Sequence, residues 1–308
     1  MKVPILFIVF NRLQTVQKVF EAIKAYQPEQ LFIGADGPRA DRKGEDEKCN
    51  NVRSWILDNI DWKCDVKTLF QETNIGCGRN PAKSTSWFFN HVDEGIIIED
   101  DVIPHPDFFE YAKILLDKYR DDDNTKAINS SNFQMEARSD GSYYFSMQNG
   151  PLCAWATWKR AWDWFDYDLD KYSYRKIESS MKWYKTTKRE KKWWLDIYRG
   201  VKRGDYGDSS WDYQFIYSIW AARGKSIVPN KNLSTNIGFG PDATHTTDPN
   251  AVTANRKMEG ILPITHPTKT SISRDADLYY HDFYYDKFVE HIPLTKKIKR
   301  FVKKIMKM

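Results

Sequence analysis

The sequence is poor in cysteine. Its four cysteines, Cys49, Cys64, Cys77 and Cys153, are spread over 308 residues and include no CxxC pair. This spacing argues against the disulfide framework that small secreted domains use. We therefore expect the cysteines to pack as small apolar side chains in a reducing, cytoplasmic environment.

Several motifs that would indicate other classes of protein are also missing. No GxGxxG and no GxxxxGK[ST] pattern occurs, so neither a dinucleotide-binding fold nor a P-loop is indicated. No apolar run is long enough to cross a bilayer. Residues 1–10 contain one lysine followed by a strand-like run, which differs from a signal peptide. We expect a cytoplasmic protein without a membrane span.

Most of the chain carries little net charge. The total is +5, but seven Lys and Arg lie in residues 294–308 with no acid among them, so the remainder carries −2. This balance argues against a general nucleic-acid binder.

Residues 294–308 place apolar side chains on one face of an expected helix and basic ones elsewhere. Such a helix suits the surface of an anionic membrane, which would make the protein peripheral on the inner face of the cytoplasmic membrane. The alternative is a terminal helix that packs on the protein and exposes its basic face to solvent.

The pattern near the N-terminus predicts an α/β fold. Residues 4–10 form an apolar run of strand length, residues 13–25 carry a helical apolar stripe, and residues 31–35 form a second strand-like run. A strand, a helix and a strand in this order form a βαβ unit with a parallel sheet. We expect a solvated loop over residues 39–48 and a helix over residues 52–60.

Three adjacent carboxylates, Glu99, Asp100 and Asp101, follow the β-branched run at residues 96–98. The run predicts a short buried strand, and ligands of open α/β sheets bind at the carboxyl ends of strands. Adjacent acids repel one another, and a cation such as Mg²⁺ or Mn²⁺ among them relieves that repulsion. The triplet indicates a metal–phosphate site, with a surface turn as the alternative.

Polar residues also follow the first two expected strands. Arg12 could pair with a phosphate, and Asp36 could accept a hydrogen bond from the N–H of a base. The alternatives are a surface ion pair for Arg12 and a turn residue for Asp36.

The triplet is followed by the sequence PDFFEY at residues 106–111, within an expected helix over residues 107–119. Together they resemble the signature of the inverting N-acetylglucosaminyltransferase that starts complex N-glycan branching. That family has the GT-A fold, uses a nucleotide-sugar and Mn²⁺, and has the triplet as its version of the DxD motif. The resemblance covers residues 4–247 in patches and is absent from residues 172–203. It implies a nucleotide-diphospho-sugar transferase fold, with a mostly parallel central sheet flanked by helices.

The resemblance also implies roles for the residues after the strands. Arg12 and Asp36 would hold the nucleotide, with Asp36 at the uracil ring. Asp101 would be the chief protein ligand of Mn²⁺ or Mg²⁺. Glu99 and Asp100 would orient the ribose, the sugar or metal-bound water.

A second set of matches lies in residues 211–247. A Trp211-Asp212 pair precedes an apolar helical run, then a short strand at residues 226–229 and a glycine- and threonine-containing loop at residues 236–247. The resembled family has the same order of parts, with the aspartate as general base and the loop closing over the donor. This implies that Asp212 is the base and that the loop brings Phe239-Gly240 and His245 to the donor. The alternative for Asp212 is a helix N-cap.

Nine of the twelve tryptophans lie in residues 155–220. The sequence CAWATW at residues 153–158 is similar to a strand that lines the acceptor side in the family, which implies acceptor contacts for Trp155 and Trp211. Tryptophan faces stack on sugars, but the alternative is that these rings form core. Residues 172–203 are basic and aromatic, and we expect an insertion of long helices and loops without an assigned role.

The resemblance divides the chain into a nucleotide-sugar half (residues 1–128), an acceptor half (129–270) and a C-terminal extension (271–308). It implies an inverting hexosyl- or N-acetylhexosaminyltransferase of bacterial type. The enzyme would move a sugar from a nucleotide-sugar, with UDP expected, to a glycan or lipid-linked acceptor in surface polysaccharide synthesis. Two other functions fit parts of the sequence: a sugar-phosphate nucleotidylyltransferase and a non-catalytic carbohydrate-binding protein.

Overall fold

A computed structural model describes residues 1–148, 150, 154–206, 209–239 and 254–285. The elements in chain order are β1 (Ile5–Val9), α1 (Leu13–Tyr26), β2 (Gln30–Ala35), α2 (Glu45–Asp58), β3 (Asp65–Phe70), α3 (Arg79–Phe88), β4 (Glu94–Glu99), β5 (Val102–Pro104), α4 (Pro106–Lys118), β6 (Thr125–Asn129), β7 (Tyr143–Ser146), β8 (Trp155–Trp158), α5 (Lys159–Trp162), α6 (Tyr174–Trp183), α7 (Lys188–Lys202), α8 (Asp212–Ala221), β9 (Lys225–Pro229), β10 (Ser234–Asn236) and α9 (Arg274–Tyr285).

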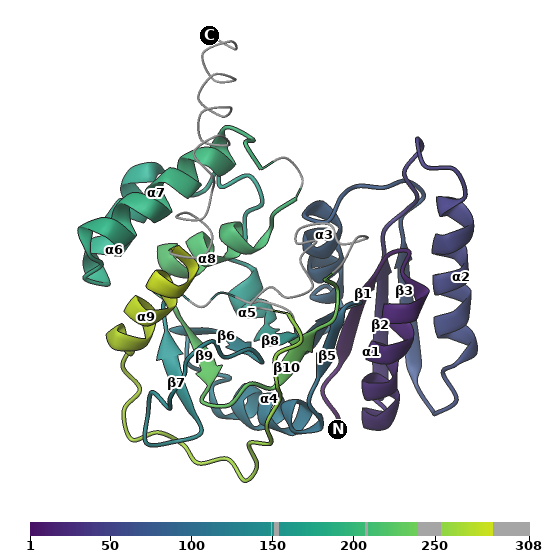
Figure 1. Ribbon diagram of the computed structural model, residues 1–308, viewed down its shortest axis with the longest axis horizontal. Helices are drawn as coiled ribbons and strands as arrows, with labels where there is room; N and C mark the ends of the chain where they lie inside the picture. The colour runs from purple at the N-terminus through teal and green to yellow at the C-terminus, as the bar shows by residue number, and fades with distance from the viewer. Residues whose placement is uncertain (149, 151–153, 207–208, 240–253, 286–308) are drawn as a thin grey trace.

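The central sheet confirms the predicted α/β class. Its eight strands lie in the order β3-β2-β1-β4-β8-β6-β9-β7, with helices on both faces (Figure 1). Neighbouring strands pair in parallel, except that β8 is antiparallel to β4 and β6, and β7 is antiparallel to β9. Both predicted halves contribute strands to this one sheet. A second, two-stranded sheet joins β5 to β10.

The inner strands read as continuous apolar runs because they are covered on both faces. Successive side chains of a strand point to opposite faces. In β1, Phe7 belongs to one hydrophobic cluster, while Leu6 and Ile8 belong to the other. In β4, Ile97 belongs to the second cluster, while Ile96 and Ile98 belong to the first. Parallel sheets that carry helices on both faces have this pattern.

Each face of the sheet has its own set of helices. The first cluster takes its helical side chains from α1, α2 and α4. The second takes them from α3 and from α5 to α8. The acidic triplet at the end of β4 is therefore held by a strand that is packed on both sides.

One boundary differs clearly from expectation. The helix predicted over residues 52–60 begins at Glu45, within the segment expected to be a solvated loop. Acidic residues in the first turn favour a helix N-terminus, and Glu45 is 5% exposed because it accepts hydrogen bonds from Asn11 and Arg39. The charges of this segment had suggested a solvated loop, but the carboxylate of Glu45 is buried and pairs with the half-exposed Arg39.

The predicted insertion folds as two helices, α6 and α7, which pack on α8 (Figure 1). Each begins at a good N-cap: Ser173 caps α6, and Thr187 forms a capping box with Glu190 at the start of α7. The apolar side chains of both helices enter the second cluster. Most of the tryptophans expected either as core or as sugar platforms are core here, while Trp164 and Trp183 are exposed.

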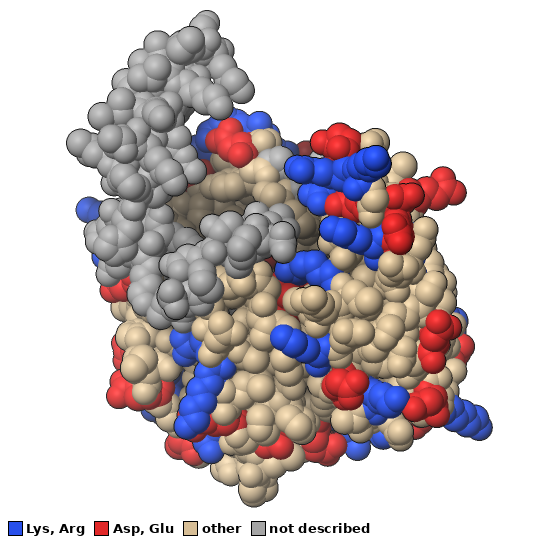
Figure 2. Space-filling view, turned by 45° about the vertical axis from the view of Figure 1, so that its right-hand side comes forward, with Lys and Arg blue, Asp and Glu red and all other residues tan. Residues whose placement is uncertain are grey.

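Charges of both signs are interspersed over the face seen in Figure 2. This agrees with the small net charge computed for the chain without residues 294–308. The basic helix expected there lies outside the described residues. Within the described part of the chain, no helix combines the length and apolar character that crossing a membrane requires.

A buried ion network fixes the insertion to the edge of the sheet. Glu190 of α7 and Asp277 of α9 are both fully buried, and Arg274 lies between them. The guanidinium contacts Glu190 Oε1 at 2.8 Å and Asp277 Oδ2 at 3.1 Å. Gln148, which follows β7, donates a further hydrogen bond to Glu190. The network thus joins three segments far apart in sequence, because Arg274 links α9 to Glu190 of α7 and Gln148 links Glu190 to the segment after β7.

We expect Arg274→Ala to lower the free energy of unfolding by about 3–5 kcal/mol, because it leaves two buried carboxylates without their cation. Urea unfolding followed by circular dichroism measures this change. The matched control is Arg203→Ala, which removes an exposed pair with Asp205 and should change stability by less than about 1 kcal/mol. Equal effects of the two substitutions would contradict a structural role for the network.

Candidate active site

The acidic triplet lies where two neighbouring strands end. Ile8 of β1 pairs with Glu99 of β4, so the segments that follow these parallel strands leave the sheet at the same edge. Arg12 follows β1, and its Nη2 atom lies 2.7 Å from Asp100 Oδ1 and 2.7 Å from Asp101 Oδ2. The sheet therefore brings together the arginine and the acids that the sequence analysis singled out separately.

Arg12 is charged, and both aspartates contribute to this. Burial lowers the pKa of the guanidinium, but the two neighbouring carboxylates outweigh burial and raise it above its ordinary value. Asp100 also accepts a hydrogen bond from the backbone N–H of Phe10 at 3.2 Å. Asp100 is the central acid of the group, held by both the side chain and the main chain of the β1 end.

Burial opposes ionisation of Glu99 and Asp100. Burial raises the pKa of Glu99 to about 8, with further contributions from Asp101, Asp100 and Asp212, while Arg12 opposes the shift. Burial likewise raises the pKa of Asp100. One arginine thus faces several carboxylates in a partly dry environment, which is an environment that favours an additional cation.

Asp212 is far from the triplet in sequence but close enough in space for its charge to reach Glu99. Asp212 is the first residue of α8, and the N-cap position belongs to Trp211, so the N-cap alternative for Asp212 is wrong. The hydroxyl of Ser210 donates a hydrogen bond to Asp212 Oδ1 at 3.1 Å. A helix N-terminus stabilises the ionised form of a carboxylate there.

Asp101 is the carboxylate best suited to a metal ion. Arg12 engages its Oδ2 atom, and its Oδ1 atom has no hydrogen-bond partner within the described part of the chain. The described residues contain no group of three or more His, Cys, Asp and Glu side chains that could hold a metal ion by themselves. Oxygen donors of this kind fit Mg²⁺ or Mn²⁺ bound by one or two carboxylates together with substrate phosphates.

Asp36 has a different role in the structure from the expected one. It is 4% exposed and pins the turn at residues 74–76. Its two oxygens accept four hydrogen bonds, from the N–H groups of Gly37, Ile75 and Gly76 and from the side chain of Asn74. Because a carboxylate has about four acceptor sites, none remains here for the N–H of a base. We assign Asp36 to the loop rather than to the nucleotide.

Trp155 and Trp211 also differ from expectation. Trp155 has no exposed surface, and Trp211 is 7% exposed. Their rings stack on one another, with centroids 5.5 Å apart and an interplanar angle of 28°. A ring without an exposed face cannot stack on a sugar, so these two side chains form the core beneath Asp212 rather than an acceptor platform.

The start of the loop expected to close over the donor lies against the triplet, in a contact with Asp101 that was not predicted from the sequence. Strand β10 pairs with β5, and the N–H of Ile237 donates to the carbonyl of Asp101 at 2.8 Å. Gly238 follows so closely that a Cβ atom there would lie 2.0 Å from Asp101 Oδ2. Strands of three residues give no periodic signal, so sequence could not have revealed this contact. Gly240 and His245, which the resemblance placed further along this loop, lie outside the described residues.

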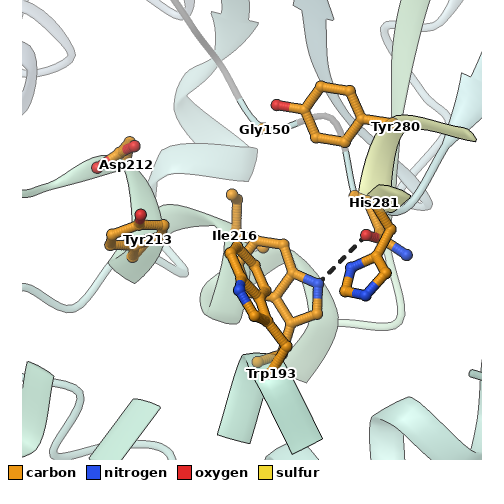
Figure 3. Close-up of a pocket in the computed structure, with 9 residues that line it drawn as sticks. Gly150, Trp193, Asp212, Tyr213, Ile216, Tyr280 and His281 are labelled. Atoms are coloured by element: carbon orange, nitrogen blue, oxygen red, sulfur yellow. Dashed lines mark hydrogen bonds between the residues drawn. The ribbon is translucent and has the colours of Figure 1, made fainter. Parts of the chain in front are cut away.

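A second missed feature is a pocket beside Asp212. Asp212 and Tyr213 of α8 form one side, while Tyr280 and His281 of α9 lie across from them, with Trp193 of α7 below (Figure 3). These residues come from three helices, one of them in the insertion. The density of tryptophans was the one signal in the sequence, and it did not distinguish Trp193 from core residues.

No protein-family model and no curated protein matches the chain. Among solved structures it is similar to TarS residues 1–349 from S. aureus, with 10% identity over 51% of this chain and 47% of that one, at a TM-score of 0.34. HddC from Yersinia pseudotuberculosis has 12% identity over 51% and 77% of the chains, with a TM-score of 0.31. The mannosyltransferase PcManGT from Pyrobaculum calidifontis, solved in complex with GDP-Man and Mn²⁺, has 15% identity over 42% and 35%, with a TM-score of 0.29.

The matched region spans less than half the length of TarS and of PcManGT. These likenesses are partial and distant. The fold of this chain is defined by its own strand order and by the helices on both faces of the sheet.

Proposed function

We propose that the protein is a metal-dependent, inverting glycosyltransferase that takes its sugar from a nucleotide-sugar. The observation that carries the proposal is the contact of Arg12 with Asp100 and Asp101 at one sheet edge, with the charge of Asp212 acting on the same group of acids. A carbohydrate-binding protein needs no such group of acids. The motif resemblance in the sequence favours this chemistry over nucleotidyl transfer.

Transfer from a nucleoside diphosphate has two requirements. The negative charge of the leaving diphosphate must be neutralised, and the acceptor hydroxyl must lose its proton. Arg12 meets the first requirement in part, since guanidinium groups bind phosphate oxygens well. A divalent ion on Asp101 would supply Lewis-acid stabilisation of the same leaving group.

Asp212 meets the second requirement as general base. The acceptor oxygen forms a bond to C1 of the donor sugar, and the bond from C1 to the diphosphate oxygen breaks, with its electron pair leaving on the nucleotide. The proton of the acceptor hydroxyl passes to the Asp212 carboxylate. A single displacement of this kind inverts the anomeric carbon. Glu99 and Asp100 would orient the ribose and the sugar around that carbon.

The finer assignments complete the proposal. A UDP-sugar is the expected donor, and the acceptor would be a glycan or a lipid-linked sugar of surface polysaccharide synthesis. The transferred group would be a hexosyl or N-acetylhexosaminyl unit. These assignments rest on the motif resemblance in the sequence.

The first prediction concerns the metal. UDP with Mn²⁺ should raise the thermal midpoint of the protein more than UDP with EDTA does. Asp101→Ala should lose most of that metal-dependent difference, because it removes the carboxylate with an available oxygen. Differential scanning fluorimetry measures the shift. Asp117→Ala, at a side chain that is 82% exposed on α4, is the control and should behave as the parent. A parent-like response of Asp101→Ala would remove Asp101 from the metal site.

The second prediction concerns the backbone over the triplet. Gly238→Ala should weaken the metal-dependent stabilisation by UDP, because the added methyl would collide with the Asp101 carboxylate. The thermal midpoint without ligand separates this effect from general destabilisation. If the Mn²⁺-dependent shift is unchanged, the backbone at Gly238 does not constrain Asp101.

The third prediction concerns the base. Asp212→Asn keeps the size of the side chain but cannot accept a proton, so turnover should fall by about 10²-fold or more while UDP and Mn²⁺ still stabilise the protein. Release of UDP from nucleotide-sugars in the presence of acceptor measures turnover. Asp163→Asn, at an exposed aspartate that ends α5, is the control. Turnover of Asp212→Asn close to that of the control would exclude Asp212 as the base.

A further inference from the structure

The pocket beside Asp212 is built largely by parts of the chain to which the motif resemblance gives no role. Its walls include Trp193 from the insertion and Tyr280 and His281 from α9 (Figure 3). The resemblance is absent from residues 172–203, and it ends before α9. The insertion and α9 thus form a pocket next to the proposed base. Residues in such a pocket would determine which acceptor this protein binds.

The position of Trp193 is well fixed. Its ring packs edge-to-face on Trp194 at 4.6 Å and 89°, and on His281 at 5.6 Å and 86°. Trp194 is in turn held by a hydrogen bond from its Nε1 atom to Gln148 at 3.2 Å. Gln148 also donates to Glu190, which belongs to the buried ion network. Trp193 and Trp194 are therefore held in place by the same network that fixes α7 and α9 to the sheet.

The lining combines aromatic faces with a few polar groups. Trp193 and Tyr213 are partly exposed, whereas His281 and Tyr280 are buried at 3% and 6% exposure. A pyranose ring has a similar character, with an apolar C–H face and a rim of hydroxyl groups, so aromatic rings with polar neighbours suit it. The cavity of about 50 Å³ would hold roughly four waters, so it has room for one edge of a pyranose ring whose face lies against the wall, and not for an extended glycan chain.

We propose that this pocket is the acceptor subsite, that it takes the terminal pyranose ring of the acceptor, and that Trp193 is the residue that stacks on that ring. A ring held there directs its reactive hydroxyl toward the carboxylate of Asp212. The proposal rests on the proposed function, because it identifies the second substrate of the same site. It also gives the insertion a role, which is to carry the specificity-determining side of the acceptor pocket.

Binding of simple pyranosides tests the proposal without requiring catalysis. The probes are methyl glucoside, methyl galactoside, methyl mannoside and methyl N-acetylglucosaminide, added singly to protein that contains UDP and Mn²⁺. Saturation-transfer NMR reports which ligand protons contact the protein. We expect at least one pyranoside to receive saturation at its ring protons, and its binding to be about tenfold weaker in Trp193→Ala, which lacks the stacking face.

Trp183→Ala is the matched control. Trp183 lies in the same insertion and is 50% exposed, but it does not line the pocket. This variant should bind the pyranoside as the parent does. Trp193→Phe retains an aromatic face and should restore binding in part, and this result excludes misfolding as the cause of the loss in Trp193→Ala.

Three outcomes would overturn the proposal. The first is that no pyranoside in the panel binds the parent. The second is that Trp193→Ala and Trp183→Ala bind equally well. The third concerns octyl glucoside, added as a fifth probe: saturation mainly on its alkyl chain would make the pocket a site for an apolar group.

Failure of the proposed function gives a different result. If UDP and Mn²⁺ do not stabilise the parent and no nucleotide-sugar is consumed, the donor assignment fails, whatever the pyranosides do. If the donor assignment holds but Trp193→Ala leaves the acceptor KM unchanged, only the acceptor subsite is wrong. A rise in acceptor KM of about tenfold with an unchanged UDP and Mn²⁺ response supports both.

Discussion

Repulsion among the carboxylates at the end of β4 is the constraint on which this site depends. The strand before them is buried on both faces, so the acids cannot move away from one another into solvent without disrupting the core. Arg12 relieves part of the repulsion by contacting two of the three acids. Burial raises the pKa of Glu99 to about 8, with smaller contributions from the charges of Asp101, Asp100 and Asp212, while Arg12 opposes the shift. A site that retains excess negative charge is suited to a divalent cation that arrives with a phosphate-bearing substrate.

The surroundings of the triplet are made by segments that follow much later in the chain. Strand β10 pairs with β5 and places Gly238 against Asp101, while α8 presents Asp212 from another direction. The insertion and α9 then complete the far side of the pocket next to Asp212. Arg274 joins α9 to α7, and Asp277 joins α9 to the end of β7, so the insertion and α9 are fixed to the edge of the central sheet.

Much of the fold could be predicted from local patterns. The runs that became β1, β2 and β4 are apolar because both faces of the sheet are covered, and the stripes of α1 and α4 have helical periodicity. Burial and short strands were not predicted where they depend on contacts between segments that are distant in sequence. Glu45 lies in a charged segment but is buried, where it accepts hydrogen bonds from Asn11 and Arg39. The short strands β5 and β10 pair with one another across a long stretch of sequence.

The sequence by itself determined the α/β class, the sheet-edge position of the acidic triplet, and Arg12, Asp101 and Asp212 as candidates for its chemistry. The fold class, the position of the triplet and Arg12 depend on the order of apolar runs and polar strand ends, which are local properties of the chain. The roles of Asp101 and Asp212 were implied by the motif resemblance. The tertiary structure alone decided that Asp36 pins a turn, that Trp155 is core, and that Trp193 faces a pocket. The sequence could not distinguish these cases, because a side chain's role depends on whether its hydrogen-bonding groups or ring faces remain available, and that is decided only when distant segments pack against it.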